Sequence, residues 1–67
     1  MDELSEIELQ ILRALRELRR TFKRVYSYHV AMEIDRGERM ARYYLARLEA
    51  AGLVRHPKGN RSGWVAA

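Results

Sequence analysis

Apolar residues recur at intervals of three and four positions over three stretches of the chain, and this spacing predicts three amphipathic helices. We expect them over residues 4–20, about 28–35 and about 38–51. The side chains expected to face a shared core are Ile7, Ile11, Ala14, Leu15 and Leu18 in the first helix, Val30, Ala31 and Ile34 in the second, and Ala41, Tyr44, Leu45, Leu48 and Ala51 in the third.

Residues typical of helix ends flank each of these stretches. Ser5 and Glu8 have the spacing of a capping box, in which the serine side chain accepts from the Glu8 N–H and the glutamate reaches back. Ser27 is expected to cap the second helix, and Gly37 the third. Gly52 follows the third helix where a left-handed residue commonly ends one.

The helical spacing fails in two places. Residues 21–26 are short, β-branched and aromatic, so we expect a brief extended segment in which Phe22 and Val25 cover the core. Residues 53–55 and 64–66 flank a stretch rich in turn-forming residues, which predicts a β-hairpin with a basic tip. Trp64 is expected to cover the base of this hairpin, with stacking on a nucleic-acid base as the alternative.

The outer face of the third predicted helix is unusual. Arg39, Arg42 and Tyr43 fall on it near the N-terminal end, and Ala46 and Ala50 follow. Arginine and tyrosine can reach phosphates and base edges, while small residues allow a helix to approach a surface closely. Such a helix fits a DNA major groove, although an arginine-rich face that is simply solvated gives the same pattern.

Charge is distributed unevenly along the chain. Residues 1–8 contain four acidic residues and no base, whereas the segment from Arg36 onward contains seven bases and two acids. This asymmetry favours an acidic partner for the C-terminal half. The acidic N-terminal segment lacks the features of a secretory signal, and no apolar run approaches the roughly 20 residues of a membrane span, so a cytoplasmic location is expected.

The sequence offers little for catalysis or for cofactor binding. There is no cysteine, no glycine-rich phosphate loop and no metal-ligand motif. His29 and Glu33 have a spacing that permits a metal pair, but no further ligand accompanies them. His56, beside Pro57, is interpreted as a hairpin residue. We therefore expect no enzyme activity, no metal and no cofactor.

The segment YLARLEAAGLV, residues 44–54, resembles the junction between recognition helix and wing in the winged helix-turn-helix transcriptional regulators of bacteria and archaea. The order of predicted elements extends the resemblance over nearly the whole chain. It implies a mainly α fold with a small β-hairpin, formed by residues 1–67 as a single domain. It also implies a double-stranded DNA-binding regulator, with residues 38–51 in the major groove and a wing over residues 53–66 on the backbone or in the minor groove.

The resemblance also implies a role for individual residues. The base-facing positions of the recognition helix are Arg39, Arg42 and Tyr43. The positions implied to contact the DNA backbone, directly or through the wing, are Gly37, Arg47, Arg55, Lys58 and Arg61. Gly37 has no side-chain hydroxyl where such proteins often carry one, so its contact would use backbone N–H groups.

Two questions stay open at the level of sequence. Leu9 and Leu12 lie outside the expected core stripe or at its edge, and they form either a homodimer contact or lone surface leucines. The basic face of the third helix also suits an acidic protein, because arginine and tyrosine are favoured at protein interfaces. The alternative function is therefore a winged-helix module that binds another protein in a larger assembly.

Overall fold

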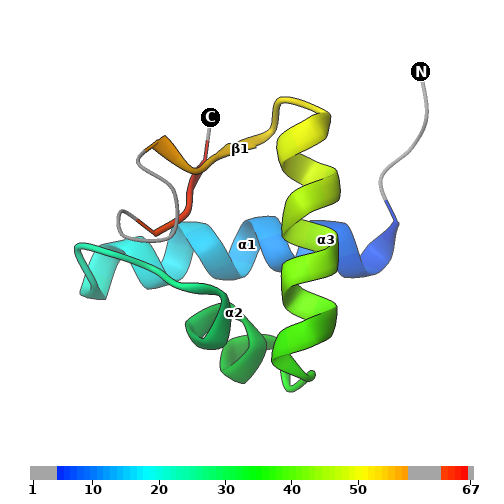
Figure 1. The fold of residues 1–67 in the computed structure, drawn as a ribbon. Helices are drawn as coiled ribbons and strands as arrows, with labels where there is room; N and C mark the ends of the chain where they lie inside the picture. The colour runs from blue at the N-terminus through cyan, green and yellow to red at the C-terminus, as the bar shows by residue number, and fades with distance from the viewer. Residues whose placement is uncertain (1–4, 58–62, 67) are drawn as a thin grey trace.

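The computed structural model describes residues 5–57 and 63–66. Its elements are three helices, α1 (Glu6–Thr21), α2 (Ser27–Ile34) and α3 (Glu38–Ala50), followed by two short strands, β1 (Val54–Arg55) and β3 (Val65–Ala66). Helix α3 runs across α1, α2 packs beside both, and the strands lie near the C-terminal half of α1 (Figure 1). The fold is thus mainly helical with a small antiparallel hairpin, an arrangement compatible with a winged helix.

Helix α1 begins at Glu6 rather than at the predicted residue 4, and the predicted capping box is present. The backbone N–H of Glu8 donates to Ser5 Oγ over 3.3 Å, and the N–H of Ser5 donates to the Glu8 carboxylate over 3.0 Å. These reciprocal bonds form the expected capping box and satisfy N–H groups that the helix itself cannot pair. Glutamates lie in the first turn and Arg19 and Arg20 in the last, as the helix dipole favours.

Helix α2 begins one residue earlier than expected, and the prediction that Ser27 caps it is wrong. Tyr26 is the N-cap residue, and its N–H donates to Nδ1 of His29 over 2.9 Å. Ser27 is instead a buried helical residue whose hydroxyl contacts α3. Ser27 therefore hydrogen-bonds to Glu38, eleven residues further along the chain, instead of capping the helix as its local sequence predicts.

A tight turn joins α2 to α3. Asp35 adopts a left-handed conformation with φ of 57°, and the N–H of Arg36 donates back to the carbonyl of Ala31 over 2.9 Å. Aspartate tolerates this conformation better than most residues because of its short polar side chain. Gly37 then serves as the predicted N-cap of α3 in an extended conformation.

The end of α3 leads directly into the hairpin. Gly52 has a φ of 80°, and the next N–H, of Leu53, donates to the carbonyl of Leu48 over 2.9 Å, which is the pattern of a Schellman cap. Strands β1 and β3 pair in antiparallel register, with Val54 opposite Ala66 and Arg55 opposite Val65. The predicted hairpin is confirmed over these residues.

A single residue of the predicted extended segment joins the hairpin. Val25 forms an antiparallel bridge with Trp64, whose N–H donates to the Val25 carbonyl over 2.7 Å. Trp64 is 8% exposed and belongs to the core, so its predicted packing role is confirmed. Thr21 differs from the prediction in being the last residue of α1.

The core lies where the three helices and the hairpin meet. Its most deeply buried side chains are Ile11, Leu15, Val25, Val30, Leu45, Leu48 and Val54. Three predictions about its edge are wrong. Leu12 is a core residue only 7% exposed, so it is not available for the dimer contact. Phe22, expected to cover the core, is 41% exposed and stacks on His29. Ala51, expected to face the core, is the exposed C-cap of α3.

Candidate nucleic-acid interface

The outer face of α3 carries the predicted cluster of arginine and tyrosine. Ala41, Leu45 and Leu48 occupy the buried stripe of this helix, which turns Arg39, Arg42 and Tyr43 outward. Tyr43 is 57% exposed. Arg39 is exposed, and its side chain makes no hydrogen bond or ion pair with any residue that the structure describes. Two guanidinium groups and a phenol ring are thereby exposed on the same face of α3.

Arg42 is held within a polar network at the start of α3. Its Nη2 donates to Glu38 Oε2 over 2.9 Å, and its Nε donates to Ser27 Oγ over 3.3 Å. The Ser27 hydroxyl donates in turn to the same Glu38 oxygen over 3.1 Å. This triad ties α2 to α3 and positions Arg42, but it also neutralises part of its charge.

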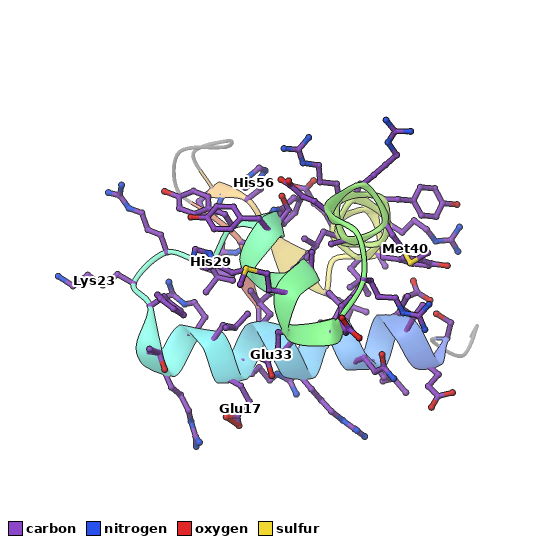
Figure 2. All side chains as sticks on the ribbon, turned by 90° about the horizontal axis from the view of Figure 1, so that it is seen from below. Glu17, Lys23, His29, Glu33, Met40 and His56 are labelled. Atoms are coloured by element: carbon purple, nitrogen blue, oxygen red, sulfur yellow. The ribbon has the colours of Figure 1, made fainter. Side chains whose placement is uncertain are left out.

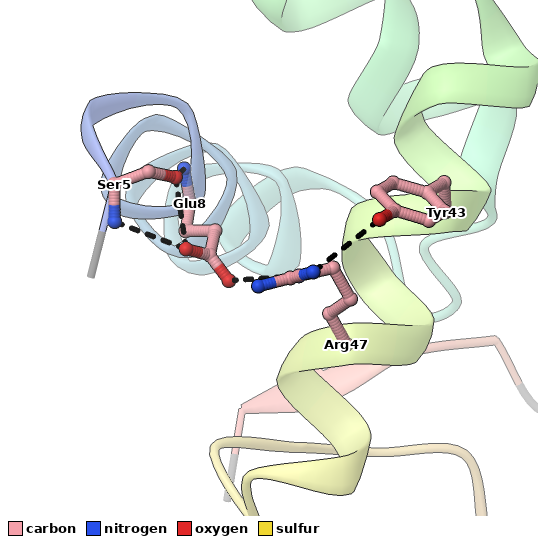
Figure 3. A network of polar contacts seen from close by, with 4 residues as sticks. All are labelled: Ser5, Glu8, Tyr43 and Arg47. Carbon is pink, nitrogen blue, oxygen red and sulfur yellow. Dashed lines mark hydrogen bonds and ion pairs between the residues drawn. The ribbon is translucent and has the colours of Figure 1, made fainter. Parts of the chain in front are cut away.

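Arg47 takes part in a second network that joins α3 to α1 (Figure 3). Its Nη1 donates to the Tyr43 hydroxyl over 3.3 Å, and its Nε lies 3.8 Å from Glu8 Oε2. Glu8 is the capping residue of α1, so one carboxylate serves both a helix end and an interhelical ion pair. Side-chain exposure of 56% leaves Arg47 accessible to a partner.

The ionisation of this second network follows from its hydrogen bonds. Donation by the Ser5 backbone and hydroxyl lowers the pKa of Glu8, and the charge of Arg47 lowers it further. The hydrogen bond to Tyr43, together with the charge of Glu8, raises the pKa of Arg47. Both residues are therefore charged throughout the physiological range.

The start of α3 and the hairpin supply the remaining predicted contacts. Gly37 is exposed and has open space around its α-carbon, so its backbone is accessible. Arg55 is exposed on β1. Lys58 and Arg61 lie outside the described residues. His56 stacks on Trp64 with ring centroids 4.0 Å apart, and Figure 2 places it on one side of α3 with Met40 on the other.

Leu9 is 42% exposed on α1, as the sequence suggested. Its role as a dimer contact stays a prediction, now without Leu12.

Over residues 5–57 and 63–66, no three His, Cys, Asp or Glu side chains are grouped to hold a metal ion. Of His29 and Glu33, the first already uses Nδ1 to accept from Tyr26. No helix among the described residues is long and apolar enough to cross a membrane.

Three residues contribute to this surface in ways that the sequence does not predict. The sequence predicts Glu38 only as the first residue of the third helix, Ser27 only as a cap, and Glu8 only as half of a capping box. The Glu38–Arg42 pair had a detectable signal, because residues four apart on a helix are neighbours. The Glu8–Arg47 pair had none, since only the crossing of α1 and α3 brings these residues together.

The comparisons with known proteins add no relative. No protein-family model, no curated protein and no solved structure matches this chain.

Proposed function

We propose that this protein binds double-stranded DNA through the outer face of α3 and acts as a transcriptional regulator. One observation carries the proposal: Arg39, Arg42 and Tyr43 project together from a helix whose opposite side is fixed in the core. A rigid helix with an exposed basic face suits a major groove. The adjacent hairpin would add the exposed Arg55 to the contact.

The residues divide into two roles under this proposal. Arg39 and Arg42 would donate to base edges, where a bidentate pair with guanine contributes about 1–3 kcal/mol of discrimination. Arg47 and Arg55 would contact phosphates, a contribution that does not depend on sequence and weakens with salt. A cytoplasmic location and a homodimer on two half-sites belong to the same proposal.

Duplex binding is tested by fluorescence anisotropy with labelled random-sequence DNA at several salt concentrations. We expect affinity to fall steeply with salt, with a log–log slope of about −3 to −4 for the four basic side chains predicted to contact the backbone, Arg47, Arg55, Lys58 and Arg61. On a duplex selected from random sequences, Arg39→Ala should weaken binding about fivefold or more. Arg16→Ala is the matched control, because Arg16 is also an exposed helical arginine without a partner among the described residues, but it lies on α1. Equal effects of the two variants would contradict the assignment of Arg39 to the DNA-binding surface.

A protein-interaction module is the second candidate. Met40 is exposed in the first turn of α3, and methionine, tyrosine and arginine are all enriched at protein interfaces. Selection of bound sequences from random duplex DNA separates the two functions. Enrichment of a consensus supports the regulator, whereas weak binding without enrichment favours the protein-interaction module.

A further inference from the structure

A hollow of about 500 Å³ lies beside the α3 surface, between the start of α2, the start of α3 and the hairpin. Four ring side chains line it: Tyr26 and Tyr28 from α2 and its cap, and His56 and Trp64 from the hairpin. Small-molecule binding sites typically have volumes of about 300–1,000 Å³, so this hollow is large enough for such a ligand. The hollow is lined by all three residues of the first polar network, Ser27, Glu38 and Arg42, and by none of the second network around Glu8 and Arg47.

The rings in this hollow are arranged for stacking. The planes of Tyr26 and Tyr28 are within 10° of parallel with centroids 5.9 Å apart, and those of His56 and Trp64 are within 7° with centroids 4.0 Å apart. Tyr28 remains 48% exposed. This ring also contacts His29, with centroids 4.2 Å apart, and its exposed part is open to stacking on a further planar group.

Polar side chains that donate and accept hydrogen bonds also line the hollow. They are Ser27, Glu38 and Arg42. Both hydrogen bonds to the Glu38 carboxylate go to Oε2, so Oε1 accepts none from the residues that the structure describes. An acceptor therefore lies next to the guanidinium donor of Arg42. Every nucleobase presents a donor beside an acceptor on its pairing edge, which is the complementary pattern.

We propose that this hollow is a binding site for one unpaired nucleobase, stacked against Tyr28 and hydrogen-bonded to Glu38 and Arg42. The base comes either from a free nucleotide or from a single strand of nucleic acid. Duplex DNA does not present such an edge, because its pairing edges are already occupied. The site shares Arg42 with the proposed duplex surface, but its ligand is unpaired, so its occupancy is measured without duplex binding.

The test follows backbone amide resonances by NMR while nucleoside 5′-monophosphates are added to the full chain. We expect saturable shifts at residues 26–28, 56 and 64, with a Kd near the millimolar range, which corresponds to a small binding free energy. Ribose 5-phosphate supplies the sugar and phosphate without the base and should give no such shifts. Shifts of equal size with ribose 5-phosphate, or none with any nucleotide, would overturn the proposal.

Two aromatic variants locate the binding. Tyr28→Ala should weaken nucleotide binding about fivefold or more, and the same spectra report whether the variant is folded. Phe22→Ala removes another exposed aromatic ring, which lines neither the hollow nor the α3 surface, and should leave nucleotide binding unchanged. Equal loss in both variants would contradict the assigned position.

A third arm distinguishes the source of the base. Unlabelled oligothymidylate and a duplex of the same length are compared for the shifts at residues 26–28. Stronger shifts with the single strand assign the site to unpaired bases in a strand, and shifts with mononucleotides alone assign it to a free nucleotide. Failure of the Arg39→Ala experiment leaves these outcomes unaffected, so the two proposals fail separately.

Discussion

Arg42 donates a 2.9 Å hydrogen bond to Glu38 one helical turn earlier, so a candidate DNA contact already has an internal counterion. Both side chains are partly exposed, and the pair also engages Ser27. Binding of Arg42 to DNA would require it to leave this carboxylate or to share it. The pair thus opposes binding of any polyanion while keeping Arg42 in a defined position.

Replacing Glu38 with glutamine should therefore strengthen duplex binding. An exposed ion pair contributes up to about 1 kcal/mol, so release of Arg42 predicts an increase in affinity of up to about fivefold. Glu49→Gln is the matched control, because it removes the same charge from an exposed position at the other end of α3. If Glu49→Gln gives the same gain in affinity in anisotropy titrations, the gain comes from overall charge and not from release of Arg42.

The features that local sequence determines were predictable. The Ser5–Glu8 capping box, the N-cap at Gly37 and the left-handed Gly52 each follow from residues a few positions apart. The buried stripes of α1 and α3 follow from spacing alone. The arginine and tyrosine of the outer α3 face were located by the same argument.

The features that were missed depend on contacts between elements. Ser27 has the local signature of a cap, yet packing of α2 on α3 buries it and turns its hydroxyl toward Glu38. Leu12 lies at the edge of its helical stripe, and only the placement of the neighbouring elements decides that it is covered. Phe22 was expected inside because it is apolar, but it stacks on the partly covered His29 instead.

The capping network at Glu8 predicts a pH dependence of stability. The pKa of Glu8 is lowered in the folded protein, so protonation favours the unfolded chain. Its stabilisation is complete above the ordinary value of 4.5 and is lost as the pH falls through the lower folded pKa. Glu8→Gln retains a capping-box residue but does not titrate. Urea unfolding from pH 6 to pH 3 should show the advantage of the wild type shrinking over that window.

The Ser5 side chain should contribute to stability on its own. Ser5→Ala removes the acceptor of the Glu8 N–H and one donor to the Glu8 carboxylate. Loss of a serine N-cap typically costs about 1 kcal/mol. The free energy of unfolding should fall by about that amount in urea titrations, and an unchanged midpoint would mean that solvent replaces the cap at no cost.

Gly63 and Gly52 make a matched pair for testing the contact between hairpin and extended segment. Both have positive φ, of 73° and 80°. A Cβ at Gly52 meets open space, whereas one at Gly63 would lie 2.8 Å from the carbonyl oxygen of Val25. Alanine at Gly52 should cost about 1–2 kcal/mol from backbone conformation alone. Alanine at Gly63 should cost clearly more, and equal midpoints of thermal unfolding would argue against the close approach.

Arg39 and Arg47 should affect DNA binding in different ways. Arg39, which has no partner among the described residues, is assigned to base edges, so Arg39→Ala should reduce the preference for a selected sequence over random DNA. Arg47 is assigned to the backbone, so Arg47→Ala should weaken binding to both and make the log–log salt slope shallower by about one. Because Arg47 also pairs with Glu8, the Arg47→Ala variant can lose stability. Its unfolding midpoint must be measured, and DNA binding must be compared under conditions in which both variants are folded. Loss of sequence preference in Arg47→Ala but not in Arg39→Ala would reverse the two assignments.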